Sequence, residues 1–199
     1  MARSRCQDLA VDCDAGGVLE MANSKVLLLS GPFSVGKSSL TKELTERHAF
    51  MKVSTSSYLN ALIPDAVSLD AVKLRRAQQI KGDQLDDETD FGWVVRPVTV
   101  NALLANPLID RWIVDAVRKS RQVTHFRDEF GGAVYHAHLH ASDVLLRSRY
   151  AGSDQDYAAA VAHSNEQSAR GLGVIADVVI DVDGLSPADL ALRIVQEMP

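Results

Sequence analysis

The sequence has little of what marks secreted, membrane-bound or nucleic-acid-binding proteins. Its two cysteines, Cys6 and Cys13, are too few for a disulfide framework or a zinc site, and free thiols in a reducing cytoplasm are the default. No apolar run approaches the roughly 20 residues of a membrane span, and the N-terminus lacks the apolar core of a signal peptide. The formal net charge is -5 without a dense run of Lys and Arg, which argues against duplex nucleic acid as the main partner. We therefore expect a cytoplasmic protein, a monomer or homodimer, that binds neither membranes nor nucleic acid.

What is present suits a single α/β domain. The chain has 199 residues, of which 46% are hydrophobic and 24% charged, an ordinary composition for a globular protein with one full core. Strand and helix patterns alternate, which favours a parallel sheet with helices on both faces, a three-layer α/β/α fold. Residues 1–24 show no convincing periodicity, so we expect an N-terminal extension there that could be flexible, followed by one domain at 25–199.

Hydrophobic patterns predict where the strands and helices lie. Five strands are predicted at 25–30, 50–54, 111–116, 133–140 and 178–181. Seven helices are predicted at 37–47, 66–80, 91–104, 122–129, 142–149, 155–169 and 187–196. The stretch 56–107 holds helices but no clear strand, and is predicted to be a helical insertion. In an open parallel sheet the ligand lies beyond the carboxyl ends of the strands, so the residues that follow each strand are the first candidates for function.

The most specific motif follows the first strand. Residues Gly31–Ser38 read Gly-Pro-Phe-Ser-Val-Gly-Lys-Ser, the pattern G-x-x-x-x-G-K-S of a phosphate-binding loop, or P-loop. The aliphatic run Val26–Leu29 before it suits a buried strand, and Leu40 and Leu44 after it have helical spacing. A P-loop needs both neighbours, because it joins a buried strand to a helix whose N-terminus faces the phosphates. This context predicts a binding site for ATP.

The residues of this loop have distinct predicted roles. Gly31 and Gly36 allow backbone conformations closed to other residues, so that successive N–H groups can converge on an anion. Lys37 is predicted to reach the β- and γ-phosphates, and the Ser38 hydroxyl to bind Mg²⁺. The predicted ATP-binding residues are Gly31, Pro32, Phe33, Ser34, Val35, Gly36, Lys37, Ser38 and Ser39.

Further short segments follow the P-loop in a defined order. Ser54-Thr55-Ser56 follows the second strand, and Arg76-x-Gln78-x-x-x-Gly82-Asp83-x-Leu85 precedes Trp93 in the insertion. Trp112–Arg118 ends the third strand with the pattern D-x-x-R, and Ala176–Ile180 begins the last strand. Together with the P-loop and an arginine-bearing late helix, these segments resemble the nucleoside and deoxynucleoside monophosphate kinases (adenylate kinase-like), including a dephospho-CoA kinase-like branch. The resemblance covers nearly all of residues 25–199, and the P-loop is its most specific motif.

The resemblance implies a reaction and a set of acceptor contacts. It implies phosphoryl transfer from ATP to a small nucleotide, in the first place a nucleoside or deoxynucleoside monophosphate. The insertion, about 56–107, would bind this acceptor, and a short lid would lie at about 147–156. The acceptor-binding residues expected on this basis are Thr55, Ser56, Arg76, Gln78, Trp93 and Arg118. Trp93 could instead be a core residue, and Arg118 a surface arginine.

The predicted catalytic residues lie in the P-loop, after the third strand and beside the lid. Asp115 could hold Mg²⁺ through water or orient an acceptor oxygen, unless it only caps a helix or turn. Arg147 and Arg149 precede a polar, Gly-containing segment and would neutralise charge on the transferred phosphoryl group, unless they only complement a helix C-terminus. The predicted catalytic set is Lys37, Asp115, Arg147 and Arg149, with Mg²⁺ at Ser38 and, through water, at Asp115.

Two groups of polar residues are expected to have structural roles. His136, His138 and His140 alternate along a strand and therefore share one face. Packing and hydrogen bonding are favoured there over a metal site, because helices cover parallel strands on both faces. His163, Asn165 and Glu166 are expected on the solvated face of a helix.

Two alternatives to nucleotide phosphorylation remain open. Within the kinases, the acceptor could be a hydroxyl group, as in a dephospho-CoA kinase-like enzyme or another small-molecule kinase. From a different class, the chain could be a nucleotide-binding switch, an assembly ATPase or a degenerate nucleotide sensor. Asp115 is followed by Ala116, whereas an assembly ATPase usually carries a second acid there to activate water, which disfavours hydrolysis as the purpose.

Overall fold

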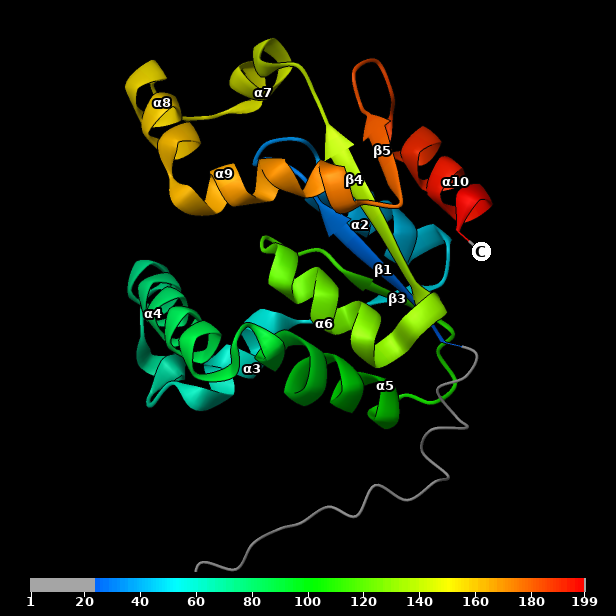
Figure 1. The fold of residues 1–199 in the computed structure, drawn as a ribbon. Coiled ribbons are helices and arrows are strands. Elements are labelled where there is room, and N and C mark those ends of the chain that lie inside the picture. Colours follow the sequence, from blue (N-terminus) through cyan, green and yellow to red (C-terminus); the bar gives the residue numbers. More distant parts are fainter. Residues whose placement is uncertain (1–23, 199) are drawn as a thin grey trace, which may run out of the picture.

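A computed structural model describes residues 24–198 of the chain (Figure 1). The predicted N-terminal extension, with both cysteines, lies outside the described residues except for Ser24. Five strands form one parallel sheet of order β2-β3-β1-β4-β5. The strands are β1 (Lys25–Ser30), β2 (Phe50–Lys52), β3 (Arg111–Val114), β4 (Val134–His140) and β5 (Val178–Asp181). The predicted five-stranded parallel sheet is therefore confirmed, with β1 at its centre.

The central strand β1 divides its side chains between two hydrophobic cores. Val26, Leu27, Leu28 and Leu29 are all fully buried. Val26 and Leu28 pack in one core with side chains of α6 (Ser120–Phe130). Leu27 and Leu29 pack in the other with α2 (Lys37–Arg47) and α10 (Pro187–Glu197). Successive strand residues point to opposite faces, so a continuous apolar run is what a strand covered on both sides requires. Figure 1 shows the resulting three layers, α/β/α.

The insertion between β2 and β3 is helical, as predicted, but divided differently. It contains α3 (Thr55–Leu62), η1 (Ala66–Ser68), α4 (Ala71–Thr89), η2 (Gly92–Val94), the π-helical turn η3 (Val95–Val100) and α5 (Asn101–Ala105). The sequence analysis missed α3 and assigned residues 53 and 54 to the second strand. Ser54 instead caps α3, with its hydroxyl accepting a hydrogen bond from the Ser57 N–H.

Two other predicted helices have different limits for identifiable reasons. The helix predicted at 66–80 is α4, which continues to Thr89 because Leu85 is buried in the core and its packing outweighs the helix-weakening Gly82. The helix predicted at 91–104 is interrupted at η3. Pro97 has no N–H to donate there, and the Thr99 hydroxyl bonds the Val94 carbonyl oxygen at 2.7 Å.

The helix predicted at 155–169 is in fact two helices. α8 (Asp154–Ala162) and α9 (Ser164–Gly171) are separated by His163, whose backbone is extended. The His163 ring accepts a hydrogen bond from the Asn165 N–H at 3.2 Å, and the Gln167 amide donates to the Val161 carbonyl oxygen at 2.6 Å. Before them, α7 (Asp143–Arg149) follows β4. The break lets α9 cross the sheet end in a direction of its own (Figure 1).

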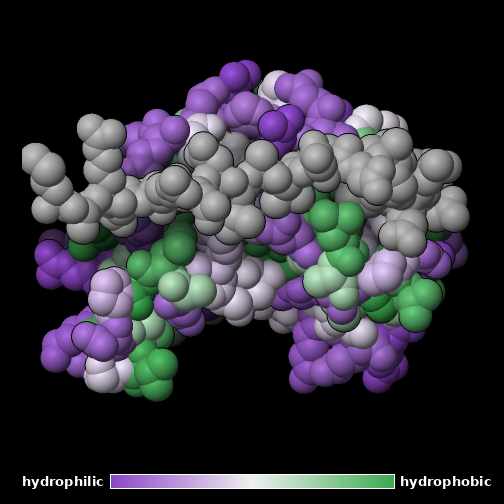
Figure 2. All heavy atoms as spheres, turned by 90° about the horizontal axis from the view of Figure 1, so that it is seen from below, coloured by the Kyte–Doolittle hydropathy of each residue, from purple (hydrophilic) through white to green (hydrophobic). Residues whose placement is uncertain are grey.

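The surface of the described residues mixes hydrophilic and hydrophobic areas. On the face seen in Figure 2, hydrophobic residues form separate groups between hydrophilic ones. Large exposed side chains include Val67, Leu108 and Val174. No helix among residues 24–198 has both the length and the apolar character to cross a membrane.

Gly31, the first residue after β1, is predicted to be essential for stability. Its φ is +136°, and a Cβ atom there would lie 2.5 Å from the Leu139 carbonyl oxygen of β4. Gly31→Ala should therefore lower the free energy of unfolding by about 2–4 kcal/mol, from backbone strain and overpacking together. Urea denaturation measures this loss.

Gly132 provides the matched control, because a Cβ atom there has no neighbour within 4 Å. Gly132→Ala should change the free energy of unfolding by less than about 0.5 kcal/mol. Equal losses in the two variants would contradict the role assigned to the close approach at Gly31.

Candidate nucleotide-binding site

The P-loop joins β1 to α2 and is curled by residues with positive φ. Gly31 and Gly36 have φ values of 136° and 107°, and Ser34 has a φ of 61°. Gly36 is also the N-cap of α2. Left-handed residues alternating with others turn successive N–H groups to one side, which creates an anion-binding concavity at the positive end of the helix dipole. The glycines thus have the conformations that the motif predicts.

A cavity of about 570 Å³ opens over this loop. Residues 33–39 form its floor, and three cationic side chains, Lys37, Arg118 and Arg149, line it. A further part of its wall is apolar and comes from the loop after β5 and from α10, with Val182, Leu185, Pro187 and Leu190. A site lined by both cations and apolar side chains can bind a phosphate chain and an aromatic base together. The volume lies within the range of small-molecule sites.

Lys37 lies inside the curl of the loop. Its ammonium group donates to the carbonyl oxygens of Gly31 at 2.6 Å and Pro32 at 2.7 Å. Burial lowers the pKa of Lys37 to about 8; the Glu166 carboxylate opposes this shift and the Arg118 guanidinium adds to it. The side chain is therefore held in place, largely protonated at pH 7, and close to losing its charge.

The two arginines predicted beside the lid face different ways. The Arg149 guanidinium donates to the Val35 carbonyl oxygen of the P-loop at 3.1 Å. Arg147 instead pairs with Asp154, donates to the Tyr150 carbonyl oxygen at 3.3 Å and lies over the Tyr157 ring. Only Arg149 of this pair lines the cavity over the P-loop.

Asp115 follows β3 and is held by two neighbours. Its Oδ2 atom accepts from the Lys52 ammonium at 2.6 Å and from the Thr41 hydroxyl at 3.3 Å. Thr41 lies three residues after Ser38 on α2, so the Asp115 carboxylate is on the same face of α2 as Ser38, one turn further on. A hydroxyl and a carboxylate are hard oxygen ligands that suit Mg²⁺, so this donor set fits the ion. Sequence analysis missed Lys52, although its place at the end of β2 was a signal.

The predicted acceptor contacts are spread over the insertion. Thr55 and Ser56 lie in the first turn of α3, directly after β2, and Arg76 is exposed on α4. The Gln78 amide donates to the Asn60 side chain at 2.7 Å, which ties α4 to α3. Trp93 is only 6% exposed, stacks on Tyr58 and donates from its indole N–H to Asp86 at 2.7 Å. The structure therefore places Trp93 in the core, the alternative to an acceptor contact that the sequence left open.

Two histidines of β4 bond Ser30, the residue directly before the P-loop. His136 and His138 are buried and both bond the Ser30 hydroxyl, at 2.7 and 2.9 Å. Burial lowers the pKa of both rings to about 4, so both are neutral at pH 7. His140 is exposed, 3.8 Å from the Asp181 carboxylate. Within residues 24–198, no group of three His, Cys, Asp or Glu side chains could hold a metal ion. The packing role expected for two of these histidines is confirmed.

Glu166 departs most from its expected place on a solvated helix face. Its side chain is 10% exposed, and its two carboxylate oxygens accept from the Phe33 N–H of the P-loop at 3.3 and 3.2 Å. The break at His163 explains the difference, because it frees α9 from the direction of α8 and lets its first turn meet the loop. Helical periodicity carries no signal for such a break.

Comparison with known proteins finds similar folds only. No protein-family model and no curated protein matches the chain. A sugar kinase from Janibacter sp. HTCC2649 is similar with a TM-score of 0.45 and 15% sequence identity, and the match covers 87% of this chain and 93% of that one. A gluconokinase from Sinorhizobium meliloti 1021 is similar with a TM-score of 0.42 and 16% identity, covering 85% and 88%. Likeness at this level says nothing about the substrate of this chain.

The lowered pKa of Lys37 predicts how nucleotide binding depends on pH. Below the folded-state value of about 8 the ammonium is charged and attracts phosphate, and above it this attraction is lost. The bound phosphates raise the pKa again, so the logarithm of the dissociation constant for ATP should rise with pH above about 8, with a slope approaching one. Calorimetric titration between about pH 7 and pH 9.5 measures this slope.

Lys37→Met is the control for this titration. It should bind ATP more weakly, with a dissociation constant that hardly changes over the same range, because the ammonium whose pKa is about 8 has been removed. A wild-type dissociation constant that stays flat through this range would contradict the assignment.

Proposed function

We propose that the chain is an ATP-dependent phosphotransferase that acts on a small molecule. The observation that supports this best is the cavity over the P-loop, where Lys37, Arg118 and Arg149 surround the place that the loop offers to phosphates. A purely structural strand–helix loop has no need of three cations at one point. The apolar wall from the loop after β5 and from α10 suits the base of the donor nucleotide.

The arrangement supports transfer mainly through positioning and charge. The P-loop N–H groups and Lys37 hold the donor phosphates, while Arg149 and Arg118 are near enough to the loop to stabilise charge that spreads over the transferred phosphoryl group. Ser38 would hold Mg²⁺ directly and Asp115 would hold it through water, and the ion would supply neutralisation of the phosphate charge. Lys52 and Thr41 fix the orientation of the Asp115 carboxylate.

For the acceptor we propose a nucleoside or deoxynucleoside monophosphate. The resemblance of the motifs supports this class, and so does the helical insertion α3–α5 between β2 and β3, whose first helices, α3 and α4, follow the carboxyl end of β2 (Figure 1). A hydroxyl acceptor, in a dephospho-CoA kinase-like enzyme or another small-molecule kinase, is the second candidate. Ala116 after Asp115, with no acid to activate water, speaks against an ATPase or switch.

An acceptor screen tests the proposed function. ADP release from ATP should be slow with the protein alone and should rise strongly with one class among nucleoside monophosphates, deoxynucleoside monophosphates, dephospho-CoA and neutral hydroxyl compounds. Rapid ADP release at a rate that no acceptor changes would favour the ATPase or switch instead. In either case Lys37→Ala should reduce turnover by about 10²–10³-fold, because a ligand of the transferred group is lost.

The arginines should differ in kinetic role. Arg149→Ala should mainly lower kcat, by about 10–10³-fold, because the charge that it meets grows during transfer. Arg76→Ala should mainly raise the KM of the acceptor, whose phosphate is charged throughout the reaction. Steady-state kinetics at saturating ATP, with the acceptor varied, separate these effects.

Arg147→Ala is the matched control, because it removes an arginine of the same helix that pairs with Asp154 and lines no part of the cavity. Its kcat should stay within about threefold of wild type. Equal loss of kcat in the Arg147 and Arg149 variants would contradict the distinction, and an unchanged acceptor KM in Arg76→Ala would remove Arg76 from the acceptor site.

A further inference from the structure

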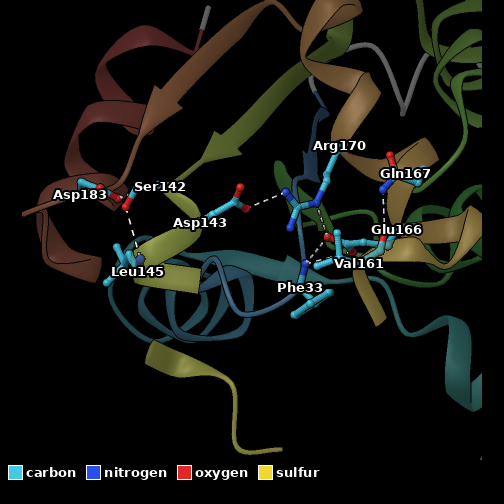
Figure 3. Close-up of polar contacts among 9 residues, drawn as sticks. All are labelled: Phe33, Ser142, Asp143, Leu145, Val161, Glu166, Gln167, Arg170 and Asp183. Carbon is cyan, nitrogen blue, oxygen red and sulfur yellow. Dashed lines mark hydrogen bonds and ion pairs between the residues drawn. The ribbon is translucent and has the colours of Figure 1, made fainter. Parts of the chain in front are cut away.

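A carboxylate from α9 contacts the phosphate-binding loop. Glu166, on the first turn of α9, accepts the Phe33 N–H with both of its oxygens, at 3.3 and 3.2 Å (Figure 3). Pro32 has no N–H, so the N–H of Phe33 is the first that the loop offers after Gly31. The P-loop binds anions through such groups. Glu166 therefore places a negative charge on the structure that has to receive a polyphosphate.

The position of this carboxylate is fixed by further contacts. The Arg170 Nε–H donates to Glu166 at 2.9 Å, and Arg170 Nη1 donates to Asp143 at 3.0 Å, so that Arg170 lies between two acids (Figure 3). The Phe33 ring forms a cluster of three with the rings of Tyr150 and Tyr157, whose centroids are each 5.4 Å from its own. The segment from α7 to α9 thus contacts both the backbone N–H and the ring of Phe33.

The charge of Glu166 also reaches the centre of the site. Among the charged groups around Lys37, its effect on the pKa of that lysine is the largest, ahead of Arg118 and Asp115. Arg170 offsets Glu166 only in part, since it is shared with Asp143. A phosphate chain that enters between Lys37 and Phe33 meets this negative charge at close range.

We propose that Glu166 is a specificity-determining residue of the donor site: it is a resident anion that a nucleotide phosphate must displace, and it makes the site select nucleotides by their charge. The proposal rests on the ATP-binding part of the proposed function. Repulsion grows with the charge of the ligand, so Glu166 weakens the binding of metal-free ATP more than that of ADP, and more than that of the magnesium complex of ATP. The site consequently favours the magnesium complex over the free nucleotide.

Glu166→Gln tests the charge while keeping the shape. The amide oxygen of the introduced side chain can still accept from Phe33 and Arg170, so the main change is the loss of one negative charge. The dissociation constant of ATP in excess EDTA should fall by about tenfold, that of ADP by less, and that of ATP in excess Mg²⁺ least. The preference for the magnesium complex should therefore shrink. Calorimetry or a fluorescent ATP analogue measures all of these without any acceptor.

Glu129→Gln is the matched control, because Glu129 also accepts an Arg Nε–H at 2.9 Å, from Arg96, and lies at the end of α6 that leads towards the start of β4, away from the P-loop. This variant changes the net charge equally and should leave each dissociation constant within about twofold. Should Glu166→Gln fail to fold in thermal melting, Glu166→Asp decides. Its carboxylate is one methylene shorter and withdraws from Phe33, so free ATP should bind more tightly than to wild type, by a smaller factor.

Each result has a definite meaning. Unchanged or weaker binding of free ATP by a folded Glu166→Gln variant would overturn the proposal. Glu166 would then only stabilise the conformation of the loop. An equal gain for free ATP and its magnesium complex would overturn the selection by charge. A wild-type protein that binds no ATP at all would contradict the proposed function itself. If the wild type binds ATP and Glu166→Gln binds it with the same dissociation constant, only the role of Glu166 is contradicted.

Discussion

The approach of Gly31 to the Leu139 carbonyl oxygen sets where the phosphate-binding loop can lie. Strands β1 and β4 run in parallel to the same end of the sheet, and the loop leaves β1 with no room for a side chain between them. This contact fixes the direction in which the loop turns, and with it the start of α2 and the position of Lys37. The cavity above the loop depends on the same contact, because residues 33–39 form its floor.

The charged side chains around the loop are partly paired with one another, and the cavity over the loop is left with an excess of positive charge. Asp115 is paired with Lys52, whereas Arg170 is shared by Glu166 and Asp143 and offsets Glu166 only in part. Below the loop, His136 and His138 are kept neutral by burial, which lowers the pKa of both rings, and add no charge. The excess of positive charge comes from the three cations that line the cavity, Lys37, Arg118 and Arg149. Such a distribution attracts a polyanion to one place rather than to the whole end of the sheet.

The parts of the fold that sequence predicts best are those set by local patterns. The apolar run of β1, the motif of the P-loop and the Ser186–Pro187 start of α10 agree with the structure, and the bounds of β1, α2 and β5 match residue for residue. The missed parts depend on local polar chemistry or on distant contacts. The Ser54 cap starts α3 where a strand was expected, and Pro97 with Thr99 interrupts a helix.

The candidate site follows the same division. The cavity lining at residues 33–39 lies within the predicted ATP-binding residues, and Arg149 was predicted beside the lid. Arg118 was predicted as an acceptor contact, and it lines the same cavity as the P-loop. Glu166 could not be predicted, because the Phe33 N–H that it accepts is 133 positions away and the helix break that brings it there has no periodic signature. For Trp93 the sequence left two interpretations open, and burial decides for the core, since an aromatic residue that fits a motif by spacing can still be needed there.

Pro32 reduces the number of backbone conformations open to the loop before a ligand binds. The ring of proline fixes one backbone torsion directly after Gly31, whose φ is 136°, and the Pro32 carbonyl oxygen accepts a hydrogen bond from Lys37. The Phe33 ring is already immobilised by two tyrosines. A loop restricted in this way has few conformations to lose when a ligand arrives. Association with a nucleotide therefore carries a small penalty in backbone entropy, and its heat reflects the exchange of contacts rather than the ordering of the chain.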